Sequence, residues 1–231
     1  MKNSWHQVWS NRKLEANERL TLETLIRLNG FDTGIARITS SAWLEGLGKI
    51  AKLIGIQGGD SVLEFGCGSG AFLFALNKVC QIKGSGIDYS SSLIDIAKTV
   101  LPEMDFTCEE AGKVSSTKKF DYCVSHSVFH YFSETYAENV LGIMAAKARK
   151  AVVVLEVPDS ATKELAEKLR RRGLQEDEYA EKYAGLDHNY YPRKWFSSNA
   201  SKLGMTCEFL ENQINYDQKD FRYGCILRKQ K

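Results

Sequence analysis

Short apolar runs alternate with helix-like segments through the middle of the chain. The runs predict strands at Ser61–Phe65, Lys83–Asp88, Asp105–Cys108, Phe120–Ser125 and Ala151–Val157. Between them, apolar residues recur at helical spacing over 71–79, 91–101 and 136–149. Strands that alternate with helices of this length indicate a parallel sheet covered by helices on both faces.

The pattern changes after Pro158. A charged helix is predicted over 161–173, capped by Asp159 or Ser160 and ended by Gly173. A polar stretch follows, and a further helix is predicted from Pro192. Two last apolar segments, 205–210 and 221–228, are expected to pair as an antiparallel hairpin at the edge of the sheet. The expected fold is therefore α/β, with a doubly wound, mostly parallel seven-stranded sheet.

Composition narrows the class of protein. Of 231 residues, 43% are hydrophobic, which is enough for a core, and the net charge of +2 argues against a dedicated nucleic-acid binder. No signal peptide or membrane span is predicted, and we expect a cytoplasmic protein that works as a monomer or homodimer. The six cysteines form no C-x-x-C pair and no zinc-like cluster, so we expect reduced, mostly buried thiols and no metal.

A glycine-rich turn carries the clearest chemical signal. The segment VLEFGCGSGAF is an apolar strand, then glycines at 66, 68 and 70, then an apolar helix. Glycines let a ligand approach the backbone, and the helix start offers free N–H groups. The next strand ends in Asp88, 18 residues after Gly70, where an acid can accept hydrogen bonds from ribose hydroxyls. This unit predicts a site for a nucleoside-containing cofactor.

The glycine spacing is G-x-G-x-G, unlike the G-x-G-x-x-G of dinucleotide sites. Together with GIDYS, the Glu110-Ala111 step, FDYCVSHSVFHYF and AVVVLEVPD, it resembles class I S-adenosylmethionine-dependent methyltransferases. The resemblance covers roughly residues 45–160 and implies a Rossmann-like fold. It divides the chain into an N-terminal helical lid, 1–44, and a methyltransferase domain, 45–231, with an acceptor-pocket insertion at about 159–192.

The resemblance also implies roles for single residues. The methionine end of S-adenosylmethionine would be held by Glu64, Gly66, Cys67, Gly68 and Gly70. Asp88 would bind the ribose, and Tyr89, Glu110 and Ala111 would lie at the adenine. Ser125 and His126 would line the channel where the methyl group meets the acceptor. S-adenosylhomocysteine is the expected product.

The candidate catalytic residues are His126, His130 and His188. His126 ends the fourth predicted strand, where open α/β sheets bind ligands, so it is a candidate base or substrate contact. His130, four residues later, would share a face with it on a helical turn, or would be a half-buried helix residue. A metal site would need a third ligand that the local sequence does not offer. His188 lies in the insertion.

Aromatic residues suggest an acceptor side. Tyr131, Tyr190 and Tyr191 are candidate substrate contacts, because each ring offers an apolar face and a polar tip; a surface loop pinned by its aromatics is the alternative for the insertion. Trp5 and Trp9, at i and i+4, either pack in the core or form a lid, with Trp5 toward the substrate and Trp9 toward the cofactor. The run Arg170–Arg172 is interpreted as a solvated helix end.

The favoured activity is transfer of a methyl group from S-adenosylmethionine to an O or N atom of a small molecule, such as a secondary metabolite, sugar or polysaccharide precursor. A non-catalytic binding subunit with this fold, a methyltransferase for protein or nucleic acid, and a nicotinamide oxidoreductase are the alternatives. A sulfonium methyl is already activated, so the protein needs mainly to place the acceptor about 3 Å away and exclude water. No catalytic triad is therefore expected.

Overall fold

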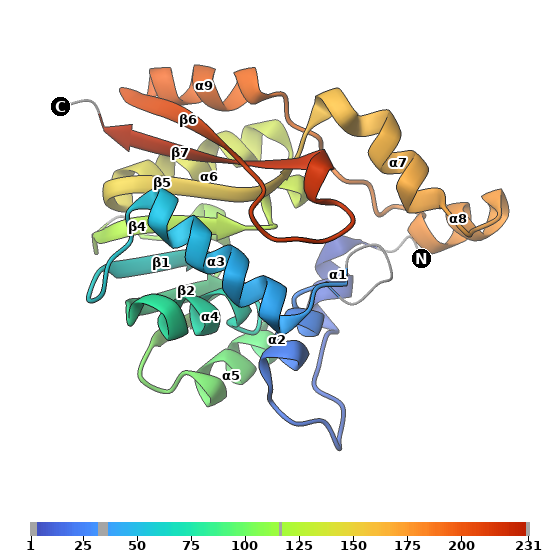
Figure 1. Ribbon diagram of the computed structural model, residues 1–231, viewed down its shortest axis with the longest axis horizontal. Coiled ribbons are helices and arrows are strands. Elements are labelled where there is room, and N and C mark those ends of the chain that lie inside the picture. Colours follow the sequence, from blue (N-terminus) through green and yellow to red (C-terminus); the bar gives the residue numbers. More distant parts are fainter. Residues whose placement is uncertain (1–3, 32–36, 116, 230–231) are drawn as a thin grey trace.

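The computed structural model describes residues 4–31, 37–115 and 117–229. In this part of the chain a seven-stranded sheet stands between two layers of helices (Figure 1). The strands are β1 (Ser61–Phe65), β2 (Lys83–Asp88), β3 (Asp105–Cys108), β4 (Phe120–His126), β5 (Ala148–Pro158), β6 (Met205–Glu211) and β7 (Arg222–Lys229).

The helices follow the predicted alternation and add some elements. The α-helices are α1 (Trp5–Ser10), α2 (Leu22–Leu28), α3 (Ser40–Ile54), α4 (Ala71–Cys80), α5 (Ser91–Val100), α6 (Glu134–Lys147), α7 (Lys163–Arg171), α8 (Glu176–Tyr183) and α9 (Arg193–Lys202). Short 3₁₀ helices are η2 (Ala111–Lys113), η3 (Phe129–Tyr131), η4 (Ser160–Thr162) and η5 (Lys219–Phe221). None of the helices in the described residues is long and apolar enough to cross a membrane.

The strand order is β3-β2-β1-β4-β5-β7-β6. The first five strands are parallel, and Val62 of β1 pairs with Gly84 on one side and Tyr122 on the other. β7 runs antiparallel between β5 and β6, so the last two strands form the predicted hairpin at the sheet edge. The mostly parallel, doubly wound fold expected from the sequence is confirmed.

The core has one half on each face of the sheet, because successive strand residues point to opposite faces. Val153 of β5 belongs to the half covered by α3, α4 and α5, and its neighbour Val154 to the half covered by α6 and α9. Both are fully buried, which explains the nearly unbroken apolar sequence of this strand.

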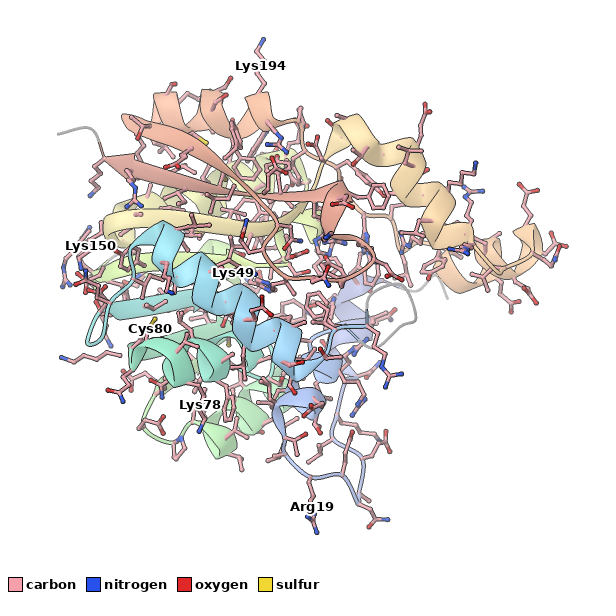
Figure 2. All side chains as sticks on the ribbon, in the orientation of Figure 1. Arg19, Lys49, Lys78, Cys80, Lys150 and Lys194 are labelled. Atoms are coloured by element: carbon pink, nitrogen blue, oxygen red, sulfur yellow. The ribbon has the colours of Figure 1, made fainter. Side chains whose placement is uncertain are left out.

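The N-terminal helices lie at the carboxyl ends of the strands (Figure 1). The Ser90 and Ser92 hydroxyls donate to the carbonyls of Trp9 and Arg12, which fixes α1 beside the start of α5. Lys150, near the amino end of β5, lies at the opposite end of the sheet (Figure 2). Helices α7 and α8 of the insertion project from the carboxyl-end side (Figure 1).

One sequence-based boundary needs correction, and one predicted polar stretch contains a helix. The division between residues 44 and 45 falls inside α3, whose Trp43 is fully buried in the sheet core, so α3 belongs to the main domain. Residues 1–3 and 32–36 of the proposed lid lie outside the described residues. The polar stretch within the insertion contains a helix, α8, which begins with a capping box of Gln175 and Glu178.

Candidate active site

The turn after β1 has a left-handed backbone at each of its three glycines. The φ angles of Gly66, Gly68 and Gly70 are 75°, 52° and 84°. The N–H groups of Gly66 and Cys67 both donate to the carbonyl of Ile87, at 2.8 and 3.0 Å, which fastens the turn to β2. The backbone conformation therefore requires glycine here before any ligand is considered.

Close packing around the turn adds a second requirement. A β-carbon at Gly66 would lie 2.6 Å from Cγ2 of Val128, and one at Gly68 would collide with the side chain of Asn29. Asn29 follows α2, and its Oδ1 accepts hydrogen bonds from the N–H and the hydroxyl of Ser69, both at 2.8 Å. The N-terminal segment thus positions the turn from outside the sheet.

Asp88 ends β2 beside this turn. Its two carboxylate oxygens accept hydrogen bonds from the N–H groups of Gly68 and Ser90, each at 2.9 Å. Burial raises the pKa of Asp88, while the same two N–H groups act against that rise. A carboxylate oxygen accepts more than one hydrogen bond, so the side chain can still receive two ligand hydroxyls.

A cavity of about 290 Å³ opens between Asp88, the glycine turn and α1. It lies at the carboxyl ends of β1, β2 and β4, which is where open α/β sheets bind ligands. The sequence-predicted site residues that line it are Trp5, Trp9, Gly66, Gly68, Asp88, Tyr89, Glu110, Ala111, His126 and Tyr131.

Four predicted cofactor residues do not line this cavity. Gly70, at the start of α4, faces Ala97 and Leu101. The buried Cys67 side chain lies against Gly86 of β2. These two residues therefore pack the turn against the rest of the fold and do not line the cavity.

Ser125 and Glu64 are the other two. The Ser125 hydroxyl is buried and donates to the carbonyl of Phe65 at 3.1 Å, so it stabilises the sheet. Glu64 is 1% exposed, and its Oε2 has no hydrogen-bond partner within the described chain. Burial and the nearby Asp88 charge raise the pKa of Glu64 well above its usual value. A ligand contact of Glu64 stays a prediction.

His126 ends β4 and lines the first cavity. Phe31, Trp43 and Phe72 surround its ring, with centroids 5.9, 5.0 and 5.3 Å away. Its Nε2 has no partner among the residues that the structure describes. Burial, and secondarily the charge of Arg222, lowers the pKa of His126 to about 3, so the ring is neutral at pH 7.

His130 does not share a helical face with His126, as the spacing suggested. The backbone between them is not helical, because Ser127 has a φ of 58° and the 3₁₀ helix begins only at Phe129. His130 contacts the ring of His188 instead, with centroids 4.5 Å apart. The two histidines predicted as a pair therefore lie in different cavities.

A second cavity of about 290 Å³ is lined by His130, His188 and Tyr190. It lies directly beside the first, because six residues line both cavities. The shared residues are Trp5, Trp9, Asn29, Phe31, Ser127 and Tyr131. The remaining lining of the second cavity comes from the N-terminal segment, the residues that follow β4 and end β5, α7, the 183–190 segment, and residues 216–222 up to the start of β7.

Helix α1 lies at this junction, because its residues Trp5 and Trp9 line both cavities. The Trp5 ring stacks on His188 at a centroid distance of 4.8 Å and 21°, and its Nε1 donates to the carbonyl of Asp187 at 2.8 Å. On the other side, His6 stacks on Tyr89 at 4.6 Å and 10°. The helix thus touches both the insertion and the residue after Asp88, as a lid over the two cavities requires.

Tyr191 is a correction to the predicted substrate contacts. Its side chain is fully buried among Phe129, Trp195 and Phe196, and its hydroxyl donates to the carbonyl of Phe132 at 2.6 Å. A bridge between Tyr191 and Asp159 ties this residue to the end of β5, which turns the ring inward. Tyr190 takes the cavity side.

Several lining residues were not singled out from the sequence. Asn29 and Phe31 contribute to both cavities, and Arg222 contributes to the second. They come from two widely separated places in the chain, and no local motif marks them. Only the three-dimensional fold brings them to the site.

Comparison with known proteins agrees with this geometry. A family model described as "Methyltransferase domain" matches residues 62–151, the segment from β1 into β5 that contains the glycine turn, Asp88 and His126.

Solved structures share the fold over most of the chain. Magnesium protoporphyrin IX methyltransferase (ChlM) from Synechocystis PCC 6803, with bound S-adenosylhomocysteine, is 12% identical with a TM-score of 0.62, covering 98% of this chain and 93% of that one. The plantazolicin methyltransferase BpumL, in complex with a pentazolic desmethylPZN analog and S-adenosylhomocysteine, is 16% identical with a TM-score of 0.64, covering 90% and 97%. A third structure is a complex between the Haloferax volcanii Trm112 methyltransferase activator and the putative methyltransferase. It is 13% identical with a TM-score of 0.65, covering 93% of this chain and 100% of that one.

The first cavity fits S-adenosylmethionine. Gly66 and Gly68 leave the backbone open beside it, Asp88 offers acceptors for ribose hydroxyls, and Tyr89 and Ala111 offer apolar walls for adenine. When bound, this cofactor supplies a methyl group already activated on a sulfonium. From the matched family model, the strand order and the glycine turn, residues 62–151 form a methyltransferase domain whose first cavity suits S-adenosylmethionine as the methyl donor.

Proposed function

We propose that this methyltransferase acts on an O or N atom of a small molecule that binds in the second cavity, named here the acceptor cavity. The observation that carries the proposal is the shared wall of the two cavities. A methyl donor in the first and an acceptor in the second would meet beside Ser127 and Tyr131. Methyl transfer needs the two cavities to be adjacent, because the nucleophile must reach the methyl carbon in line, at about 3 Å.

The cover over the acceptor cavity supports a small acceptor. Trp5 of α1 bonds to Asp187 of the insertion, so the two covering segments are joined above the cavity. A folded protein or a nucleic acid would reach the junction only after these contacts separate. A small molecule needs a transient opening, after which closure excludes water.

The histidines and Tyr131 that line the two cavities are uncharged at neutral pH. Burial lowers the pKa values of His130 and His188 well below the usual value, as it does for His126, and raises that of Tyr131 to about 12. Neutral imidazoles accept hydrogen bonds and orient a hydroxyl or amine acceptor. Because burial disfavours the protonated form of these imidazoles, we expect positioning of the acceptor to contribute more than general-base catalysis.

The cellular setting belongs to the same proposal. The six cysteines are free thiols, which accords with a reducing cytoplasm. A monomer or homodimer stays the expected assembly.

The test is a methylation assay with isotopically labelled S-adenosylmethionine across a panel of small hydroxyl and amine compounds. We expect label transfer to at least one compound, with release of S-adenosylhomocysteine. Trp5→Ala serves as the matched variant, because it removes a wall shared by both cavities. Label transfer to bulk protein or RNA, with none to any small molecule, would contradict the proposal.

A further inference from the structure

Arginines from distant parts of the sequence line the acceptor cavity. Arg170 comes from the last turn of α7, Arg222 from the start of β7, and Arg12 from the segment after α1. No Asp or Glu is found among the described residues that line this cavity. The lining therefore carries positive charge without a carboxylate facing the same space.

Arg222 is held rigidly at the edge of the cavity. Its Nη1 donates to the carbonyl of Glu156 at 2.9 Å and its Nη2 to Oε1 of Gln218 at 3.3 Å, and its side chain is 11% exposed. The Glu156 carboxylate, 3.9 Å from Nε, accepts hydrogen bonds from Tyr216 and Asn212. Burial raises the pKa of Glu156 and the Arg222 charge opposes that rise, so Glu156 is a buried ion-pair partner that holds the guanidinium from the side of the sheet.

Arg170 differs from the two arginines that follow it. Its guanidinium lies 4.0 Å from the ring centroid of Tyr183, which aims it into the acceptor cavity. Arg171 and Arg172 are exposed and line neither of the two cavities. Arg171 also stacks on a ring, that of Tyr179 at 4.5 Å, but outside both cavities, so the interpretation of the run as an exposed helix end fails for Arg170 alone.

The charges of these arginines also shift the pKa values of neighbouring titratable groups. The charges of Arg170 and Arg222 add to the lowering of the pKa of His130 and His188 that burial mainly causes. The same two charges favour the ionised form of Tyr131, against the larger effect of burial. Two guanidinium groups thus act on the cavity centre from different elements.

Resting on the proposed function, we infer that the acceptor is a small anion whose carboxylate or phosphate group binds Arg170 and Arg222, with an apolar, planar body against Trp5 and Tyr131. Guanidinium groups favour both of these anions, because their N–H donors match paired oxygens and stay charged. Aromatic walls favour a planar body. The acceptor atom would then lie at the opposite end of the molecule, toward the first cavity.

Isothermal titration calorimetry with matched probes tests this inference. The pairs are 4-hydroxybenzoate against 4-hydroxybenzamide and cinnamate against cinnamamide, with phenyl phosphate as the phosphate arm, each with and without saturating S-adenosylhomocysteine. We expect at least one anion to bind about tenfold or more tightly than the neutral amides. The stronger of the carboxylate and phosphate arms identifies the head group.

Variants assign the effect to a residue. Arg170→Gln should weaken anion binding about tenfold while leaving amide binding unchanged, and Arg170→Lys should restore part of it. Arg171→Gln, on the same helix end but outside both cavities, should bind anions as the wild type does. Melting temperatures of all variants check that they are folded.

The inference is overturned if no probe anion binds more tightly than the amides, or if Arg171→Gln weakens anion binding as much as Arg170→Gln. Failure of the proposed function looks different. It shows as absent S-adenosylhomocysteine binding or absent transfer to small molecules, and the titrations without that ligand still decide the anion preference.

Discussion

The indole Nε1 of Trp5 donates a hydrogen bond to the carbonyl of Asp187 at 2.8 Å, joining residues 182 positions apart in the sequence. This bond links α1 to the insertion directly above the junction of the two cavities. Because α1 has only six residues, contacts of this kind hold it in place more than its own helical hydrogen bonds do.

Replacement of Trp5 tests whether α1 retains the cofactor. Trp5→Ala removes the bond to Asp187 and the stack on His188, together worth about 1–3 kcal/mol. We expect dissociation of S-adenosylhomocysteine, measured by stopped flow, to become roughly tenfold faster or more. Trp5→Phe keeps a ring and should lie between the variant and the wild type. Identical dissociation rates for Trp5→Ala and wild type would show that α1 is not a lid.

Replacement of Gly68 tests the turn. Gly68→Ala places a β-carbon against Asn29 on a left-handed backbone, so we expect a loss of about 1–3 kcal/mol in the free energy of unfolding. Gly142→Ala is the matched control: it lies in α6, and a β-carbon there meets nothing within 4 Å. That change should leave stability equal or raise it by up to about 1 kcal/mol. Thermal denaturation of both proteins measures the difference, and equal losses would refute the steric account.

The pH dependence of stability tests the environment of His126. The folded pKa of about 3 lies below the usual value near 6.5, so between these values the unfolded chain binds a proton that the folded chain does not. Stability contributed by the neutral ring is therefore complete above about pH 6.5 and is lost as pH falls, by at most about 1.4 kcal/mol per pH unit.

His126→Phe should remove the part of this pH dependence that His126 contributes, while its ring fills the same aromatic surroundings. Denaturant unfolding at pH 7 and pH 5 should show a smaller loss in the variant than in the wild type. His130 and His188 titrate in the same direction, so the dependence will shrink without vanishing. An unchanged difference between the two pH values would mean that the pKa of His126 in the folded protein lies near its usual value.

Periodicity was sufficient to predict the sheet, because the central strands β1, β4 and β5 are apolar runs and the shorter strands alternate regularly with helix-like segments. Asp88 followed from its distance after Gly70, since a strand, turn and helix of fixed length bring these points together. In irregular segments, neither periodicity nor spacing tells which of two neighbouring residues lines a cavity and which lies in the core. Tyr190 lines the acceptor cavity whereas Tyr191 lies in the core, and the bridge of Tyr191 to Asp159 that decides this is a tertiary contact.

The same limit explains the residues that were missed. Asn29 holds the glycine turn through hydrogen bonds to Ser69, 40 positions away, and nothing beside it in the sequence indicates this. Arg170 and Arg171 are adjacent basic residues near the end of one helix. Only the position of the Tyr183 ring directs the first of them into the acceptor cavity.

Binding of S-adenosylhomocysteine to the wild type and to Asp88→Ala, measured by titration calorimetry, addresses the cofactor site most directly. The account predicts saturable binding by the wild type and a loss of about 1–3 kcal/mol in Asp88→Ala, where ribose hydroxyls lose their acceptor. Asp95→Ala, an exposed acid on α5, should bind as tightly as the wild type. A wild type that does not bind this compound, or an Asp88→Ala protein with unchanged affinity, would contradict the account.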